Sequence, residues 1–239
     1  VPAFRLELIG MKVQEISNVE VTRALITDSY TSAVPLGALG LAYDLNDANE
    51  LYTNVSQGYR PKEYDDLANP TSSGQRSPSD LDESRTWTYE VGLRGTPTAW
   101  WSYDTSYFLI DYDNFIENRD LGGGNSERAN SGRAIYQGWE LANELDLIGL
   151  YDALAHTEHG KPWGRLSFYG NLSMLDAEFA SGSNEDKDPA YAPTYFVKTG
   201  LVYRLQDRVK AAFTSQFVGN HYWQDSDAAG TVGTTTVAS

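Results

Sequence analysis

The sequence contains no cysteine, and this absence excludes several kinds of site at once. Its 239 residues can form no disulfide, no cysteine-held iron–sulfur cluster, no thiolate zinc site and no cysteine nucleophile. No stretch approaches the roughly 18 consecutive apolar residues that a membrane-spanning helix needs. Basic residues are scarce, with 18 Lys and Arg against 33 Asp and Glu and a net charge of -15. A general nucleic-acid binder, which carries clustered Lys and Arg, is therefore excluded.

The motifs of common enzyme classes are also missing. The sequence has no Gly-x-Ser-x-Gly elbow, no P-loop and no dinucleotide-binding fingerprint. His156 and His159 have His-x-x-His spacing, but they lack the glutamate and third ligand of a zinc hydrolase. The acidic run at 184–188 lacks the spacing of a calcium loop and is better explained as a solvated loop. We therefore expect no enzyme, no metal site and no cofactor.

The dominant pattern is an alternation of apolar and polar residues with a period of two. In the segment Arg85 to Gly95, Trp87, Tyr89, Val91 and Leu93 share one face and polar or small residues share the other. Such alternation is typical of a strand with one apolar face. Nine candidate strands of roughly ten residues follow this pattern to different degrees. They lie at 4–8, 39–45, 51–60, 85–95, 98–112, 134–147, 166–175, 195–205 and 209–217.

The connections between these strands alternate between long and short. The long ones are 10–34, 61–84, 113–132 and 177–193, and the short ones are 46–49, 95–98 and 205–208. The connection at 149–164 is intermediate, and Leu147 to Ala155 can form one short helix. A meander of this kind has one elaborate end and one plain end, as transmembrane β-barrels do. We therefore predict an all-β fold, an antiparallel transmembrane barrel meander with long extracellular loops and short periplasmic turns.

Strand length and aromatic placement support the membrane prediction. A barrel strand crosses the bilayer with about 9–11 residues, and Trp87, Trp100, Trp101, Tyr112 and Tyr203 lie near strand ends, where interfacial aromatic girdles form. The alternative is a soluble or surface-attached β-rich module that recognises glycans through its aromatic loops. The two differ in whether the apolar strand faces form one continuous exposed band.

Blocks of sequence in a fixed order resemble the barrel of TonB-dependent outer-membrane receptors, nearest to the ferric-siderophore and ferric-citrate branch. They are Val1–Glu7, Leu51–Pro61, Tyr89–Gly95, Tyr107–Ile116, Asn130–Leu141, Asp176–Glu178 and Ala192–Pro193. The chain departs from the family pattern at Tyr59, where Phe is usual, at Pro61, where two prolines are usual, and at Ala3, where Gly is usual. The likeness runs through most of the chain, from Val1 to about Trp223.

This resemblance implies an internal piece of a barrel, about nine strands of the roughly 22 that such transporters use. Residues 1–239 are then a portion of the barrel domain, without the plug domain and the C-terminal strands, and both ends are expected to be cuts through a longer chain. The implied function is uptake of an iron chelate across the bacterial outer membrane. The implied partners are the TonB–ExbB–ExbD complex, reached through the missing plug, a ferric chelate and outer-membrane lipid, but no nucleic acid.

The resemblance also suggests two sets of functional residues. Arginine binds anionic chelates well because its guanidinium matches a carboxylate as a fork, and aromatic rings can stack on a catecholate. Candidate ligand residues in the expected extracellular loops are Arg60, Tyr64, Arg76, Arg85, Arg119, Arg128, Arg133, Tyr136, Tyr222 and Trp223. Candidate lumen residues facing the plug are Glu90, Arg94, Glu140, Glu144 and Asp146. The plainer interpretations are solvated or packed loop side chains for the first set and cross-strand wall pairs for the second.

Overall fold

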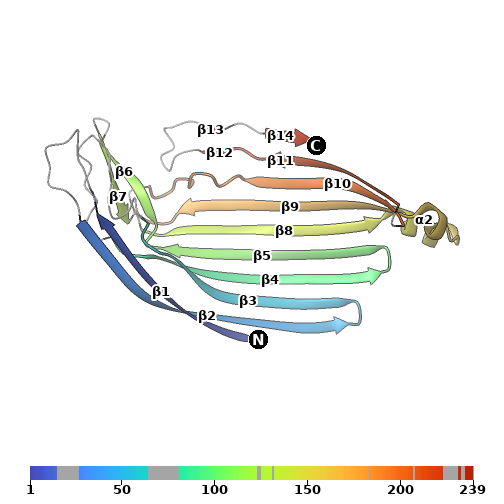
Figure 1. The fold of residues 1–239 in the computed structure, drawn as a ribbon, viewed down its shortest axis with the longest axis horizontal. Helices are drawn as coiled ribbons and strands as arrows, with labels where there is room; N and C mark the ends of the chain where they lie inside the picture. Colours follow the sequence, from blue (N-terminus) through green and yellow to red (C-terminus); the bar gives the residue numbers. More distant parts are fainter. Residues whose placement is uncertain are drawn as a thin grey trace.

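A computed structural model describes residues 1–14, 27–63, 81–122, 125–130, 132–182, 184–206, 208–222, 231–232 and 235–238. In these residues ten strands form one antiparallel sheet (Figure 1), in the order β1-β2-β3-β4-β5-β8-β9-β10-β11-β14. The strands are β1 (Pro2–Gln14), β2 (Thr27–Asn46), β3 (Asn49–Arg60), β4 (Ser84–Thr98), β5 (Trp101–Asp113), β8 (Ala134–Asp146), β9 (Arg165–Phe179), β10 (Tyr195–Leu205), β11 (Val209–Val218) and β14 (Thr235–Ala238).

The predicted meander is confirmed, because each strand pairs with its neighbours in the chain except where a local hairpin intervenes. All nine candidate strands fall on the first nine strands of the sheet, and β14 adds a short tenth. The expected long connection at 10–34 was wrong. The β1–β2 pairing continues to Gln14 and Thr27, whereas β2 and β3 pair only as far as Ala38 and Ser56. The strand ends were missed because the backbone pairing of β1 with β2 extends into residues that lack an alternation of apolar and polar side chains.

The long connection expected at 113–132 is present between β5 and β8, and it contains a hairpin that was not expected. Strands β6 (Ile116–Gly122) and β7 (Asn125–Asn130) pair with each other in a separate two-stranded sheet. Another small sheet joins β12 (His221–Tyr222) to β13 (Thr231–Val232). Segment 116–122 reads IENRDLG, which has no apolar face, so its pairing left no trace in the hydrophobic pattern.

The opposite end of the sheet carries tight turns and one helical insertion. The helix expected at Leu147–Ala155 is present as α2, and α3 (Gly160–Trp163) follows it. The Asp146 carboxylate caps α2 by accepting a hydrogen bond of 3.2 Å from the Gly149 backbone N–H. His156 ends the helix in the left-handed conformation, with a φ of 55°. Within the described residues, no helix has the length and apolarity needed to cross a membrane.

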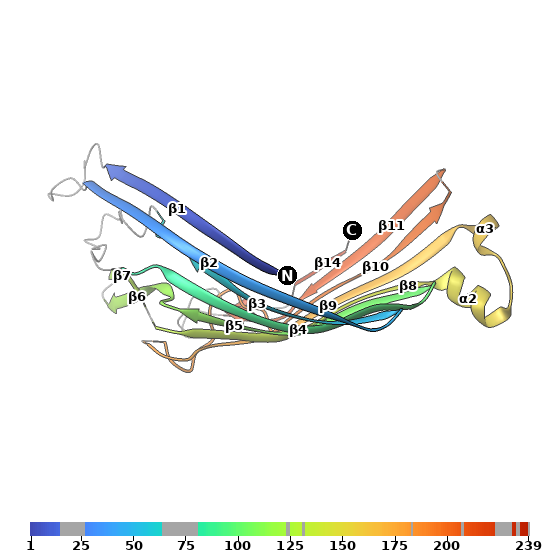
Figure 2. The same ribbon diagram turned by 90° about the horizontal axis from the view of Figure 1, so that it is seen from below.

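The sheet is curved like a trough, with β1 and β11 rising on the same side (Figure 2). The strand register separates the two faces by side-chain type, because successive side chains alternate across a strand. Polar side chains share the concave face, whereas large apolar side chains are exposed on the convex face. The convex set includes Phe4, Leu6, Leu8, Leu39, Leu41, Tyr43, Leu51, Trp87, Tyr89, Val91, Tyr107, Trp139, Phe168, Met174, Leu201 and Phe213.

This continuous apolar band is the feature that separates the two fold predictions. A soluble sandwich would bury these side chains against a second layer. Here the buried apolar side chains of the described residues are few, namely Val34, Leu81, Ile116, Ala134, Ala177 and Phe179. A band of this extent needs a lipid environment, and the membrane-barrel fold is the one that the sheet supports.

The band has the height of a membrane. Near its plain end, the Trp101 indole N–H donates to the Asn143 amide oxygen at 2.8 Å, and the Tyr103 hydroxyl donates to the Asn49 amide oxygen at 2.7 Å. Asp111 lies at its other end on the same strand face. Asp111 lies ten positions after Trp101, which corresponds to about 33 Å along the strand. At a strand tilt of about 40°, this length spans about 25 Å along the bilayer normal.

A charge placed on the convex face should destabilise the barrel, whereas the same charge on the concave face should not. We expect Val91→Arg to lower the free energy of unfolding by about 2–4 kcal/mol, because it places a guanidinium near the bilayer centre. The matched control is Ala142→Arg on the concave face, with an expected cost below about 1 kcal/mol. The measurement is denaturant unfolding of the complete barrel in lipid vesicles. Equal costs for the two variants would contradict the assignment of the faces.

Candidate functional site

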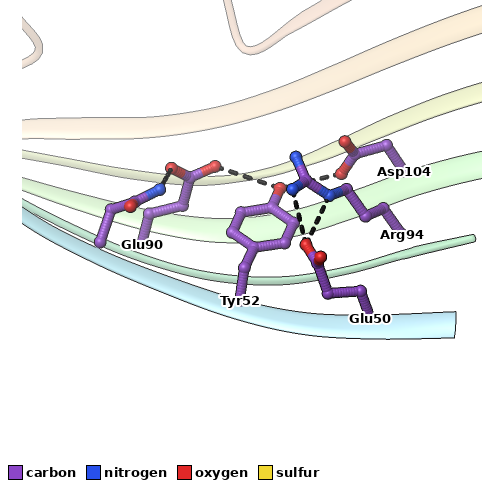
Figure 3. A network of polar contacts seen from close by, with 6 residues as sticks. Glu50, Tyr52, Glu90, Arg94 and Asp104 are labelled. Atoms are coloured by element: carbon purple, nitrogen blue, oxygen red, sulfur yellow. Dashed lines mark hydrogen bonds and ion pairs between the residues drawn. The ribbon is translucent and has the colours of Figure 1, made fainter. Parts of the chain in front are cut away.

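A polar network occupies the middle of the concave face, across strands β3, β4 and β5 (Figure 3). The Tyr52 hydroxyl donates to the Asp104 carboxylate at 2.8 Å and lies 3.4 Å from the Glu90 carboxylate. The Asn54 amide donates to the other Glu90 oxygen at 3.1 Å. Together, these contacts tie three strands through side chains as well as through the backbone.

A glycine opposite Tyr52 makes this arrangement possible. Tyr52 and Gly92 are direct cross-strand partners, and a Cβ atom built on Gly92 would lie 2.3 Å from the Tyr52 ring. The absent side chain lets the ring lie across β4 and carry its hydroxyl to Asp104 on β5. Arg94 covers the same ring, with its Cζ atom 5.2 Å from the ring centre, and its Nη2 atom lies 2.6 Å from the Glu50 carboxylate.

A second group of charges lies on β8 and β9. Arg165 approaches Glu144 at 3.5 Å and Asp146 at 3.4 Å, and the Ser173 hydroxyl lies 3.5 Å from the Glu140 carboxylate. The five candidate lumen residues therefore share the concave face, where each contacts another wall side chain. These contacts are cross-strand pairs within the wall, the plainer of the two interpretations offered by the sequence. Contact of these residues with a plug stays a prediction.

Between the two groups the wall is acidic. Tyr52, Glu90, Asp104, Ser106 and Glu140 line a shallow hollow of about 440 Å³. Among the described residues, none of its three carboxylates forms an ion pair within 4.0 Å. The chemistry of this hollow suits a cationic group presented from the lumen, because unpaired carboxylates attract positive charge.

A second hollow lies at the end with the long connections. It has a volume of about 390 Å³ and is lined by Tyr30, Lys62, Asp82, Glu83, Arg85 and Asn114. The Tyr30 hydroxyl donates to Glu83, and the Lys62 ammonium lies 5.3 Å from the centre of the Tyr30 ring. Arg85 was a candidate from the sequence, whereas Lys62 was missed. Its position directly after the Arg60-Pro61 strand end was the signal that could have found it.

The other candidate ligand residues are not gathered in this hollow. Arg133 forms a fork with Asp111, with distances of 2.6 and 2.8 Å, and this hydrogen-bonded carboxylate raises the pKa of Arg133. Arg60 lies 3.5 Å from Glu63, and Tyr136 occupies the concave face of β8.

The remaining candidates lie in the small sheets or outside the described residues. Tyr222 lies in β12, and its carbonyl accepts a hydrogen bond of 2.8 Å from the Tyr191 backbone N–H. Arg119 and Arg128 belong to the β6–β7 hairpin. The candidates Tyr64, Arg76 and Trp223 lie outside the described residues. A ligand role for any of these candidates therefore stays a prediction.

The described residues hold no cluster of three or more His, Asp or Glu side chains arranged to bind a metal. His159, half of the His-x-x-His pair, contacts Asp152 at 2.9 Å and Thr157 at 3.0 Å through its Nδ1 atom. His156 instead forms the left-handed end of α2. The two histidines therefore serve the local fold of this insertion.

The kind of barrel follows from the family to which the sequence is similar. Residues 15–239 match the family model described as TonB dependent receptor-like, beta-barrel. The chain belongs to this family. Barrels of the TonB-dependent receptors lie in the bacterial outer membrane, and the family consists of transporters and not of enzymes. The resemblance, the fold class and the location expected from the sequence are therefore confirmed, and the glycan-binding module is set aside.

Solved structures show the same fold. The ferric citrate transporter FecA superposes with a TM-score of 0.71 at 18% identity, covering 99% of this chain and 33% of that one. The siderophore receptor PiuA from Acinetobacter baumannii gives 0.74 at 11% identity, covering 99% and 33%. The copper transporter OprC gives 0.70 at 17% identity, covering 99% and 35%. The chain thus spans about a third of the length of these proteins, and the likeness establishes the fold alone.

The Gly92–Tyr52 contact predicts a position-specific cost of adding one methyl group. We expect Gly92→Ala to lower the free energy of unfolding by about 1–3 kcal/mol, because the new methyl displaces the Tyr52 ring from Asp104. The control is Gly10→Ala in β1, where no atom lies within 4 Å of the added Cβ. Thermal unfolding of the complete barrel measures both variants, and a neutral Gly92→Ala would show that the ring does not need this space.

Proposed function

We propose that the complete protein is an outer-membrane receptor that takes up an iron chelate, a ferric siderophore or ferric citrate, with energy supplied through TonB. The observation that carries the proposal is the two-faced sheet: a convex apolar band that suits lipid, and a concave polar wall that suits a lumen. The match over residues 15–239 to the receptor barrel family supports it.

The choice of an anionic chelate rests on the cations at the long-loop end. Arg85 and Lys62 line one hollow there, Arg60 is the last residue of β3, and Arg133 directly precedes β8. Guanidinium groups bind carboxylates and other chelate oxygens as forks. Among proteins of similar fold, the names ferric citrate transporter and siderophore receptor point to the same class of ligand.

We further propose that residues 1–239 form part of one barrel domain and that the rest of the protein supplies the plug and the remaining strands. Two features support this arrangement: the sheet formed by the described residues is open at β1 and β14, and the chain spans about a third of similar proteins. The acidic hollow around Glu90, Asp104 and Glu140 would take basic side chains of the plug. The plug would then contact TonB, which works with ExbB and ExbD.

The proposal can be tested with the complete receptor in a bacterial strain that lacks its other iron receptors. Radiolabelled ferric citrate and a panel of ferric siderophores are supplied one at a time, in the presence and absence of TonB. We expect TonB-dependent uptake of one chelate class. Uptake of none of the chelates, or uptake that persists without TonB, would contradict the proposal.

The ligand hollow predicts a defined loss of affinity. We expect Arg85→Ala to weaken chelate binding about tenfold, because a charge-assisted hydrogen bond contributes about 1.5 kcal/mol or more. The control is Arg208→Ala, which removes a cation from the turn at the opposite end of the sheet. Equilibrium binding of the accepted chelate to the purified receptor gives both affinities, and an unchanged affinity for Arg85→Ala would remove this hollow from the ligand site.

A further inference from the structure

The helical insertion between β8 and β9 has an unusual composition for an element at the plain end of a barrel. Helix α2 reads LIGLYDALA, in which only Gly149 and Asp152 are not apolar, and none of its residues is buried. The Leu154 side chain is 74% exposed and that of Tyr151 is 52% exposed. Trp163 in α3 is 51% exposed. The insertion therefore presents apolar surface that no described part of the chain covers.

The insertion is nevertheless held in a defined shape. The Asp152 carboxylate lies 3.0 Å from the Thr157 hydroxyl and 2.9 Å from the His159 ring. That ring packs against Trp163, with 4.1 Å between ring centres, and lies 5.6 Å from the Tyr151 ring. A nine-residue helix is marginal by itself in water. The stability of α2 therefore depends on these contacts and on the environment of its exposed apolar side chains.

The last residues of the insertion lie beside the convex face. The Tyr203 hydroxyl belongs to the convex face of β10 and donates to the Trp163 carbonyl at 2.8 Å. At the start of α2, a Cβ on Gly149 would lie 3.0 Å from the Trp100 Cβ atom. The end of the insertion thus meets the convex face at Tyr203, and its start meets Trp100 in the turn between β4 and β5. Figures 1 and 2 agree that α2 lies beyond the ends of the strands.

From this placement we propose that the insertion is a membrane anchor in which α2 lies in the headgroup region of the outer membrane's periplasmic leaflet, with Tyr151, Leu154 and Trp163 in contact with phospholipid. Helix α2 is about 14 Å long, too short to span a hydrocarbon core of about 30 Å. Helices of this kind lie in the interface plane with their apolar side chains below the headgroups. Phospholipid is the expected partner because the insertion continues from the lipid-facing band. The proposal does not depend on which ligand the receptor transports.

The charges of the insertion define the mode of binding. Between Leu147 and Gly164 the sequence has Asp152, Glu158 and a single Lys161. This balance offers no polybasic patch to anionic headgroups, so the contact depends on apolar burial and interfacial aromatics. Lipid contact should therefore be insensitive to the fraction of anionic lipid and to salt.

Site-directed spin labelling of the complete receptor in phospholipid vesicles tests the proposal. Since this chain has no cysteine, Leu154→Cys introduces a single labelling site into it. References are Val91→Cys in the lipid-facing band, Glu140→Cys on the concave wall and Glu158→Cys, an exposed polar position of the same insertion. Each label is probed with oxygen, which partitions into lipid, and with a water-soluble nickel complex.

We expect the Leu154 label to be several-fold more accessible to oxygen than the Glu158 label and to resemble the Val91 label. Neutral and partly anionic vesicles should give the same result, as should salt raised to about 0.5 M, where surface charges are screened. A Leu154 label as accessible to the nickel complex as the Glu158 label would place α2 in water and overturn the proposal. A label reached by neither reagent would show that protein covers the helix, which would overturn it as well.

Discussion

The structure depends on the requirement that backbone N–H and C=O groups within a membrane find partners inside the protein. An antiparallel sheet meets this requirement through its ladders, and the alternation of side chains then assigns one face to lipid and the other to the lumen. The ten-stranded trough follows both conditions. Its stability comes from pairing and from lipid contact, because neither face is covered by a second layer of the described chain. The described interior is therefore small, and the apolar side chains that a soluble fold would bury lie on the outside.

The concave face shows how a polar wall can be ordered without a hydrophobic core. Tyr52 spans β4 because Gly92 leaves room for its ring, and its hydroxyl joins the Asp104 and Glu90 carboxylates. Such side-chain bridges restrict the strands to one register, since a shift by one residue would turn the ring to the lipid face. The same wall leaves carboxylates without ion-pair partners among its described neighbours, and they are the groups proposed to meet the plug.

Much of this fold could be predicted from the sequence where lipid imposes an alternation. The clear period in Arg85 to Gly95 and the helix at Leu147–Ala155 both correspond to elements of the structure. The hairpin of β6 and β7 could not be predicted, because strands outside the bilayer have no apolar face to repeat. The candidate ligand residues were harder still. Arg85 was suggested by its residue type and position, and Lys62 has a similar position directly after a strand end. The pairing of β3 with β4, which brings the two cations to one hollow, is encoded by no local pattern.

The long hairpin of β1 and β2 has a consequence for the energetics of capture. Strand β2 has 20 residues, about 65 Å of chain. Its part from Ala38 onward pairs with β3, whereas its earlier part, back to Thr27, pairs with β1 alone. Pro35, which has no N–H to donate, lies in the part of β2 that has left β3. This two-stranded arm is regular paired backbone. In the receptor proposed above, cargo that met the arm would lose less binding free energy to chain ordering than cargo that must fix a flexible segment.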